Sequence, residues 1–216
     1  MASTPRTEGG RAKSRRSPAP GERHRDAERS RAQLLAAALD EFSAKGYAGA
    51  RVGDIAKRAG LNKQLITYYF GGKEGLYRAV EEQWLADEAE LVPPEGSLDE
   101  LVASHLHAVL ADPRHSRLLL WDGLTGSSRP DQGSARSPED PAVTDLRRRQ
   151  REGELAGDLE PAMVLVALMG AALAPVAIPQ VVRRSTGLDP SDPEFARRYA
   201  EVLRQIARRL AAAPPE

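Results

Sequence analysis

Five side chains between Lys63 and Tyr68 carry groups that suit contact with DNA bases. Lys63 can donate to guanine, Gln64 can pair with adenine, and Thr67 can bond to a base or touch a thymine methyl. Leu65 can face the groove beside them. A helix of about seven residues fits the major groove, so the pattern predicts a base-reading helix. The alternative for Lys63 and Gln64 is that they are solvated residues of a first helical turn.

Residues on either side of this helix carry groups that contact DNA phosphates. Lys73 is expected to begin the next helix, where its cation and the free backbone N–H groups can both meet a phosphate. Arg51 and Tyr69 are placed to contact the DNA backbone as well. Packing in the core is the alternative for Tyr68 and Tyr69, whereas Ile66 is expected to point into that core.

The segments around these residues have the periodicity and the stop signals of short helices. Three helices are predicted in succession, over residues 26–45, 52–59 and 63–69. In the first, apolar residues recur at helical spacing: Leu35, Ala38, Leu39 and Phe42. Gly46 and Gly60 each follow a helix, where a left-handed glycine ends it, and Asn62 is a good N-cap for the third. Three helices of these lengths, with a glycine in the second turn, match the helix-turn-helix layout.

The rest of the chain is also predicted to be helical. Ser97 and Glu100 have the spacing of a capping box. Further helices are expected to begin at Lys73 and to cover about 98–112, 114–124, 142–154, 159–184 and 192–213. No stretch of useful length alternates apolar and polar residues as a strand does. The predicted fold class is therefore all-α, with an N-terminal three-helix helix-turn-helix domain and a larger helical domain.

Composition predicts how the chain divides. Residues 1–25 are rich in Arg, Pro, Gly and Ser and lack apolar periodicity, which predicts a disordered basic arm. Residues 26–72 form the predicted DNA-binding domain, and residues 73–216 form the larger domain. Within the larger domain, residues 125–141 are rich in Ser, Gly, Pro and charge, which predicts a mobile loop.

The charge of the chain is balanced in total but unevenly distributed. Residues 1–80 hold 16 Lys and Arg against 8 Asp and Glu, whereas residues 81–216 hold 15 against 23. A basic front beside an acidic remainder indicates that only the front meets a polyanion. Most of the excess of positive charge lies in residues 1–25, which hold seven basic and two acidic side chains. Charge alone is therefore weak support for DNA binding.

Neither a catalytic set nor a metal-binding set of residues is visible in the sequence. The absence of Cys excludes disulfides, thiolate nucleophiles and Cys-based zinc sites. His105 and His107 point to nearly opposite sides of a helix, so they cannot chelate one ion together. No nucleophile elbow or phosphate loop is present. We therefore expect no enzyme, no metal and no cofactor. The lack of Cys and of an apolar signal segment favours a cytoplasmic location.

The stretch from Leu34 to Trp84 resembles the TetR family of transcriptional regulators. The resemblance depends on several spacings at once, carried by Phe42, Gly46, Tyr47, Val52, Asp54, Ile55, Ala56, Ala59, Gly60, Leu61, Tyr68, Tyr69, Phe70, Lys73, Leu76 and Tyr77. Two positions depart from the family pattern. Thr67 stands where the family usually has Tyr, and Gly53 stands where a longer polar side chain is common. Both positions concern DNA contacts, so they leave the base specificity open.

The resemblance implies a homodimer, formed mainly by the last two long helices, and a helical ligand-binding domain. Large apolar side chains are expected around its pocket: Trp84, Leu106, Val109, Leu110, Leu120, Trp121, Met163, Val166 and Met169. Ordinary core packing is the alternative for each. The uncharged run 161–182 is long enough to span a membrane, but Pro175 and Pro179 lie inside it. A helix buried between its own domain and a partner subunit also fits, so no membrane partner is expected.

Together these features predict a ligand-responsive regulator, namely a repressor that a small, largely apolar molecule releases from a palindromic operator. The ligand would favour the state that does not bind DNA, and the helix from Lys73 would connect the two domains. The alternative is a helical protein-interaction or membrane-associated module without sequence-specific DNA binding. The effector, the operator sequence, the target genes, the choice between repression and activation, and the role of the basic arm stay open.

Overall fold

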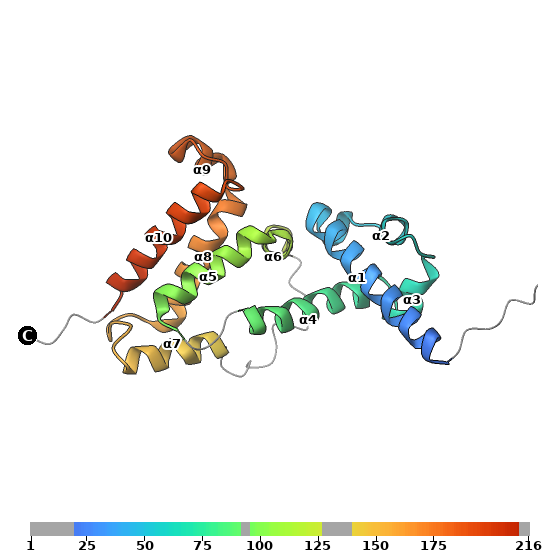
Figure 1. Cartoon of the computed structure of the whole chain (residues 1–216), viewed down its shortest axis with the longest axis horizontal. Coiled ribbons are helices and arrows are strands. Elements are labelled where there is room, and N and C mark those ends of the chain that lie inside the picture. Colours follow the sequence, from blue (N-terminus) through green and yellow to red (C-terminus); the bar gives the residue numbers. More distant parts are fainter. Residues whose placement is uncertain (1–19, 92–95, 127–139, 212–216) are drawn as a thin grey trace, which may run out of the picture.

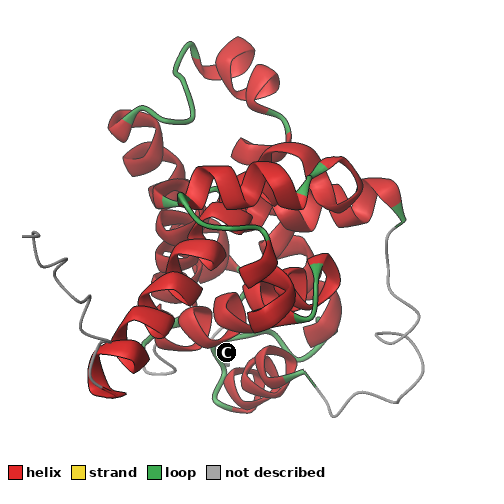
Figure 2. Cartoon of the chain, turned by 90° about the vertical axis from the view of Figure 1, so that its right-hand side faces the viewer, coloured by secondary structure: helices red, strands yellow, loops and turns green. Residues whose placement is uncertain are grey.

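The structure, a computed structural model, describes residues 20–91, 96–126 and 140–211. Within these ranges the chain forms ten α-helices and no strand (Figure 1, Figure 2). The helices are α1 (Pro20–Gly49), α2 (Val52–Ala59), α3 (Gln64–Phe70), α4 (Lys73–Leu91), α5 (Leu98–Ala111), α6 (Arg114–Thr125), α7 (Pro141–Arg151), α8 (Pro161–Ala177), α9 (Pro179–Thr186) and α10 (Pro193–Arg209). The predicted all-α fold class is confirmed.

One apolar core joins α1, α2, α3 and the first half of α4, at the right of Figure 1. Its largest fully buried side chains are Leu34, Phe42, Ile55, Ile66 and Leu76. Leu118 of α6 also belongs to this core. We call the unit formed by α1, α2 and α3 the head. Apolar residues recur at helical spacing in α1 and so form one side of that helix. This side packs in the same core as α2 and α3.

A second core lies among α5, α7, α8 and α10. Its buried members are Leu98, Val102, Ala103, Leu106, Leu146, Ala200, Leu203 and Ala207. Helix α10 lies along α5 (Figure 1), because its apolar residues form one side and its charged residues the other. The head and the helical bundle therefore each have a core of their own, and α4 runs between them.

A fully buried arginine fixes the start of α5 against α7. Arg149 is 0% exposed and donates to Asp145, to Glu154 and to the backbone carbonyl of Gly96, at 2.6 to 2.7 Å. Glu154 also accepts a hydrogen bond from the backbone N–H of Leu98 at 3.1 Å. A buried charge is tolerated only when it is paired and hydrogen-bonded, and this network meets that requirement.

Polar contacts connect the head to α6. The Trp121 indole packs against Gly46 and donates to the carbonyl of Ser43 at 3.3 Å. The Arg114 guanidinium pairs with Asp40 of α1 at 2.8 Å and also with the adjacent Asp112. These contacts place the end of α1 and the whole of α6 in one junction. Helix α6 is therefore in direct contact with the head.

Several predicted helix boundaries hold closely, whereas one predicted helix is wrong. Residues 159–184 do not form a single helix, because α8 ends at Ala177 and α9 begins at Pro179 with a bend of 84°. Proline disfavours the helical conformation of the residue before it, and Ile178 accordingly has φ −132° and ψ 53°. The predicted capping box is confirmed, since Glu100 accepts from the backbone N–H of Ser97 at 3.2 Å.

The two segments predicted to lack regular structure are only partly described. Helix α1 begins at Pro20, six residues before the predicted start, so residues 20–25 are helical. Residues 1–19 lie outside the described part of the chain, as do residues 127–139 of the predicted loop. Asp140 caps α7 by accepting from the backbone N–H of Ala142 at 2.8 Å.

The apolar run that begins at Pro161 is divided between two helices, α8 and α9. Among the described residues, no single helix is long and apolar enough to cross a bilayer. Helices α8 and α9 meet the length and composition criteria only together, and the bend of 84° lies between them.

Candidate DNA-binding interface

A glycine-containing turn sets the direction in which α3 leaves α2. Gly60 ends α2 in the left-handed conformation, with φ +67°, which costs other residues about 1–2 kcal/mol. The N–H of Leu61 then bonds to the carbonyl of Ala56 at 3.0 Å. The Asn62 side chain accepts from the backbone N–H of Gln64 at 2.9 Å, as its predicted capping role requires. The turn of the helix-turn-helix is therefore specified by local sequence.

Helix α3 has one side in the core of the head and one side in solvent. Ile66 is 1% exposed, which confirms that it points into the core. Four of the predicted base-contacting residues are exposed: Lys63, Gln64, Thr67 and Tyr68. Tyr68 is 79% exposed, so core packing is the wrong alternative for it. The exposed side thus presents an ammonium, an amide, a hydroxyl and a phenol.

The remaining members of the predicted set lie at the edge of this surface. Leu65 and Tyr69 are half-buried and pack against the core of the head. Arg51 is exposed and stands immediately before α2, where its carbonyl accepts from the N–H groups of Asp54 and Ile55. Its side chain therefore projects into solvent next to a helix N-terminus.

Lys73 has a partner that the sequence did not reveal. Its Nζ lies 4.5 Å from the centroid of the Tyr47 ring, which is a cation–π contact. Burial lowers the pKa of Lys73 from its ordinary value. The ring of Tyr47 in turn contacts Tyr77 and Phe42. The cation at the start of α4 is thus held by an aromatic cluster. Tyr47 was among the family-like residues, but its spacing from Lys73 gives no signal of the contact.

The link from α3 to α4 contains a close backbone approach. Gly71 and Gly72 have φ values of +72° and +124°, so both adopt conformations that favour glycine. A Cβ on Gly75 would lie 1.8 Å from the backbone carbonyl oxygen of Phe70. Only glycine fits there, because carbon and oxygen atoms cannot approach so closely. Gly75 therefore fixes the angle between α3 and α4, and the sequence analysis missed this residue.

A buried carboxylate ties α1 to α2 behind the interface. Glu41 is 1% exposed, bonds to Lys45 and lies 3.6 Å from the guanidinium of Arg58. Lys45 lies 3.6 Å from Asp54 of α2 as well. The hydrogen bond to Glu41 raises the pKa of Lys45. These pairs orient α2 against α1, and so they position the turn that carries α3.

The residues predicted to line a ligand pocket lie on four helices, namely α4, α5, α6 and α8. Leu106, Val109 and Leu110 lie on α5, where the first two are buried. The three predicted residues of α8 are Met163 (61% exposed), Val166 (66% exposed) and the half-buried Met169.

The other predicted pocket residues lie near the junction with the head. Trp84 of α4 stacks on His115 of α6, with ring centroids 5.8 Å apart. Trp121 packs against Gly46, and Leu120 beside it is half-buried. Trp84 and Trp121 therefore contribute to the packing of α6 against α4 and α1.

A helix-turn-helix with an exposed third helix, joined by α4 to a helical bundle, defines a DNA-binding transcriptional regulator. The sequence model described as "Bacterial regulatory proteins, tetR family" matches residues 34–80. The model described as "Tetracyclin repressor-like, C-terminal domain" matches residues 97–209. The chain therefore belongs to the TetR family of transcriptional regulators, as the sequence predicted.

Similar proteins are regulators as well. The transcriptional repressor SCO4008 of Streptomyces coelicolor is 32% identical over 193 residues, which cover 86% of this chain and 97% of that protein. The regulator RutR of Escherichia coli K12 is 36% identical over 114 residues, which cover 50% of this chain and 54% of RutR. Among solved structures, the regulator SCO4942 of Streptomyces coelicolor has a TM-score of 0.67 at 28% identity, covering 82% of this chain and 97% of its own.

Proposed function

We propose that the protein is a homodimeric repressor that binds a palindromic operator through α3 and is released by a small, largely apolar effector. The observation that carries this proposal is the exposed polar side of α3, with Ile66 anchoring the other side in the core. A short helix that projects polar groups from a rigid support suits the major groove. Lys63, Gln64, Thr67 and Tyr68 would contact bases, with Leu65 beside them.

Phosphate contacts would fix the register of this helix. Arg51 precedes α2, Tyr69 lies in the last turn of α3, and Lys73 stands at the N-terminus of α4 with its ammonium over Tyr47. A phosphate at that end would meet both the ammonium and unpaired backbone N–H groups. Such contacts add affinity without sequence information. The proposal therefore assigns affinity to Lys73 and base preference to Gln64.

The proposed dimer would bury apolar side chains that one chain leaves in solvent. Met163 and Val166 of α8 are 61% and 66% exposed, and Val202 and Ile206 of α10 are 47% and 43% exposed. Burial of such side chains is worth about 25 cal/mol for each Å² removed from water. A two-fold pairing of these helices would give two copies of α3 and hence a palindromic operator.

We infer that the effector binds in the bundle, with Leu106, Val109 and Leu110 of α5 and the half-buried Met169 of α8 as contacts. Membership of the family supports a ligand-responsive regulator rather than an enzyme, and it supports a location in the cytoplasm with the DNA. An effector that binds better to the state without DNA would release the operator by a population shift. The contacts between α1 and α6 would couple that change in the bundle to the position of the head.

Selection of bound fragments from random DNA tests the operator. An enriched palindrome is expected with the purified protein. Gln64→Ala should change the ranking of bases within the site, whereas Lys73→Ala should weaken binding to every sequence. Gln33→Ala, at an exposed position of α1, is the matched control and should change neither. A single half-site, or equal losses from both variants at all sequences, would contradict the proposal. Light scattering that gives a monomer mass at micromolar concentration would contradict the dimer.

A further inference from the structure

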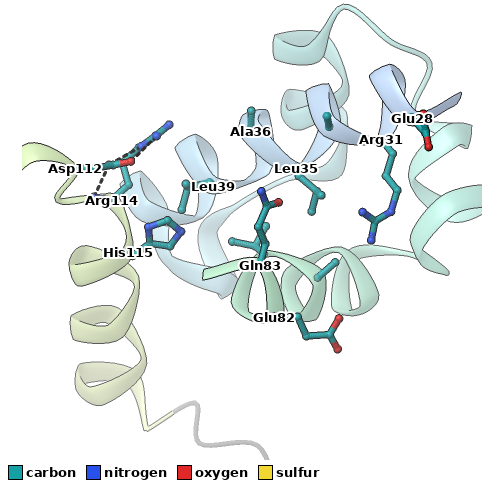
Figure 3. Close-up of a pocket in the computed structure, with 13 residues that line it drawn as sticks. Glu28, Arg31, Leu35, Ala36, Leu39, Glu82, Gln83, Asp112, Arg114 and His115 are labelled. Atoms are coloured by element: carbon teal, nitrogen blue, oxygen red, sulfur yellow. Dashed lines mark hydrogen bonds and ion pairs between the residues drawn. The ribbon is translucent and has the colours of Figure 1, made fainter. Parts of the chain in front are cut away.

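A groove of about 650 Å³ lies between α1, α4 and the start of α6, away from the exposed side of α3 (Figure 3). Small-molecule sites typically have volumes of about 300–1,000 Å³. None of the pocket residues predicted from the sequence lines this groove. One wall belongs to the head, and the other belongs to the connecting helix α4 and to α6. It is therefore separate from an effector pocket inside the bundle.

The floor of the groove is apolar and is built from both walls. Leu35 and Leu39 of α1 face Ala79 and Val80 of α4, and each of these side chains is buried to more than nine-tenths. Ala36 stands on the rim of α1, where its small side chain leaves the groove open. An apolar body laid along this floor would displace water from both walls at once.

Arg31 supplies a charged group at one end of the groove. Its side chain extends into the space between α1 and α4, toward which the Gln83 amide also points (Figure 3). Its guanidinium lies 5.2 Å from the centroid of the Phe70 ring, and it forms no ion pair with any carboxylate of the described residues. Glu82 of α4 also lines the groove, and it forms no ion pair with Arg31. A guanidinium without a carboxylate partner can donate two parallel hydrogen bonds to a carboxylate.

The cation at the other end is already engaged. Arg114 bonds to Asp112 and to Asp40, and these bonds together with the ion pairs raise its pKa. Glu28, near Arg31, lies 3.2 Å from His24. Among the described residues that line the groove, Arg31 thus stands beside an apolar floor without a carboxylate partner. This combination selects for a negative head group on an apolar body.

We propose that the groove binds a small amphipathic carboxylate, with its head group on Arg31 and its apolar body along Leu35 and Leu39. The ligand would contact the head and α4 together. The site therefore lies where a bound molecule senses the relative position of the two parts of the chain. This inference does not depend on the operator or on the effector proposed above, because it concerns binding alone.

Calorimetry with decanoate and 1-decanol tests the site on the full-length protein, because the two probes share a chain and differ in the head group. Decanoate should bind about tenfold more tightly than 1-decanol, since a hydrogen-bonded charge contributes a factor of this order. Arg31→Gln should remove that difference. Ala36→Trp, which fills the groove, should weaken both probes at least tenfold. Arg29→Gln, an exposed change on α1 outside the groove, is the control and should change neither.

Three results would overturn the proposal. The first is the absence of decanoate binding. The second is equal affinity of the native protein for the two probes, which would exclude recognition of the carboxylate. The third is native affinity for decanoate in Arg31→Gln, which would place the site elsewhere. Arg31→Gln alters one exposed side chain and keeps the test decisive if Ala36→Trp fails to fold.

Discussion

Replacing Gly75 by alanine should disturb the angle between α3 and α4. An added Cβ would lie 1.8 Å from the carbonyl oxygen of Phe70, whereas real Cβ atoms essentially never lie within 3.0 Å of a non-bonded heavy atom outside their own and the adjacent residues. At least 1.2 Å of movement is therefore required (3.0 minus 1.8). The obstructing atom belongs to the backbone, so no side-chain rotation relieves the contact. Gly75 does not have a positive φ, so its conformation alone would accept alanine.

The magnitude follows from two opposing effects of the Gly75→Ala change. Overpacking in a well-packed region costs about 1–3 kcal/mol, and a backbone obstruction belongs at the upper end of that range. Alanine recovers about 1 kcal/mol relative to glycine within a helix. We therefore expect Gly75→Ala to lower the free energy of unfolding by about 2 kcal/mol. It should also weaken DNA binding, because the end of α3 must move.

The matched control is Gly53→Ala. Gly53 lies in α2, where an added Cβ meets nothing within 4 Å. The same chemical change should there raise the free energy of unfolding by about 0.5–1 kcal/mol. Urea unfolding at one fixed protein concentration compares the two variants, because the stability of a dimer depends on concentration. If Gly75→Ala unfolds at the same urea concentration as Gly53→Ala, or at a higher one, the reasoning from the close approach is refuted.

Two further predictions concern the bundle. Arg149→Met should lower the free energy of unfolding by about 3 kcal/mol, because it leaves two carboxylates without their buried partner, and urea unfolding measures this loss. For Asp99, hydrogen bonds from Ser97 and Arg208 outweigh burial and lower its pKa below the ordinary value of 3.8. The ionised Asp99 therefore stabilises the folded state at pH values above its pKa in the unfolded chain. This stabilisation is lost as the pH falls through its pKa in the folded protein. Asp99→Asn should therefore destabilise the protein at pH 6, with a difference that shrinks as the pH falls below about 4, as thermal unfolding can follow.

Each of these predictions has its own control or contrary outcome. Arg151→Met changes an exposed arginine of the same helix and should shift the stability by less than about 0.5 kcal/mol. If Arg149→Met and Arg151→Met changed the free energy of unfolding equally, the buried network around Arg149 would not contribute to stability. For Asp99, a destabilisation by Asp99→Asn that persists unchanged at pH 2 would rule out the charge as its source.

The sequence predicted the head well because local signals determine it. Gly60 and Asn62 carry the turn and the cap within the segment itself, and the burial of Ile66 follows from helical spacing. The split of residues 159–184 into two helices was missed, although Pro179 marks it, because apolar composition continues across the break. Proline geometry outweighed composition there.

Contacts between distant parts of the chain were beyond prediction. Lys73 over Tyr47 and Arg31 in its groove depend on how packed helices meet, and no pattern of spacing encodes that. The predicted pocket residues illustrate the same limit. Periodicity identified Met163 and Val166 as large apolar residues of a helix, but it does not distinguish a face toward a pocket from a face toward solvent.

The position of Trp121 gives this protein a built-in optical probe. The chain has two tryptophans, and Trp121 rests on Gly46 with its indole N–H bonded to the carbonyl of Ser43. Trp121 is 37% exposed in this position, so separation of α6 from α1 would bring the covered remainder of its indole into water and shift its emission to longer wavelength. The state of the junction can therefore be followed in the unlabelled protein, during a titration with DNA or with a ligand, through the colour of its own fluorescence.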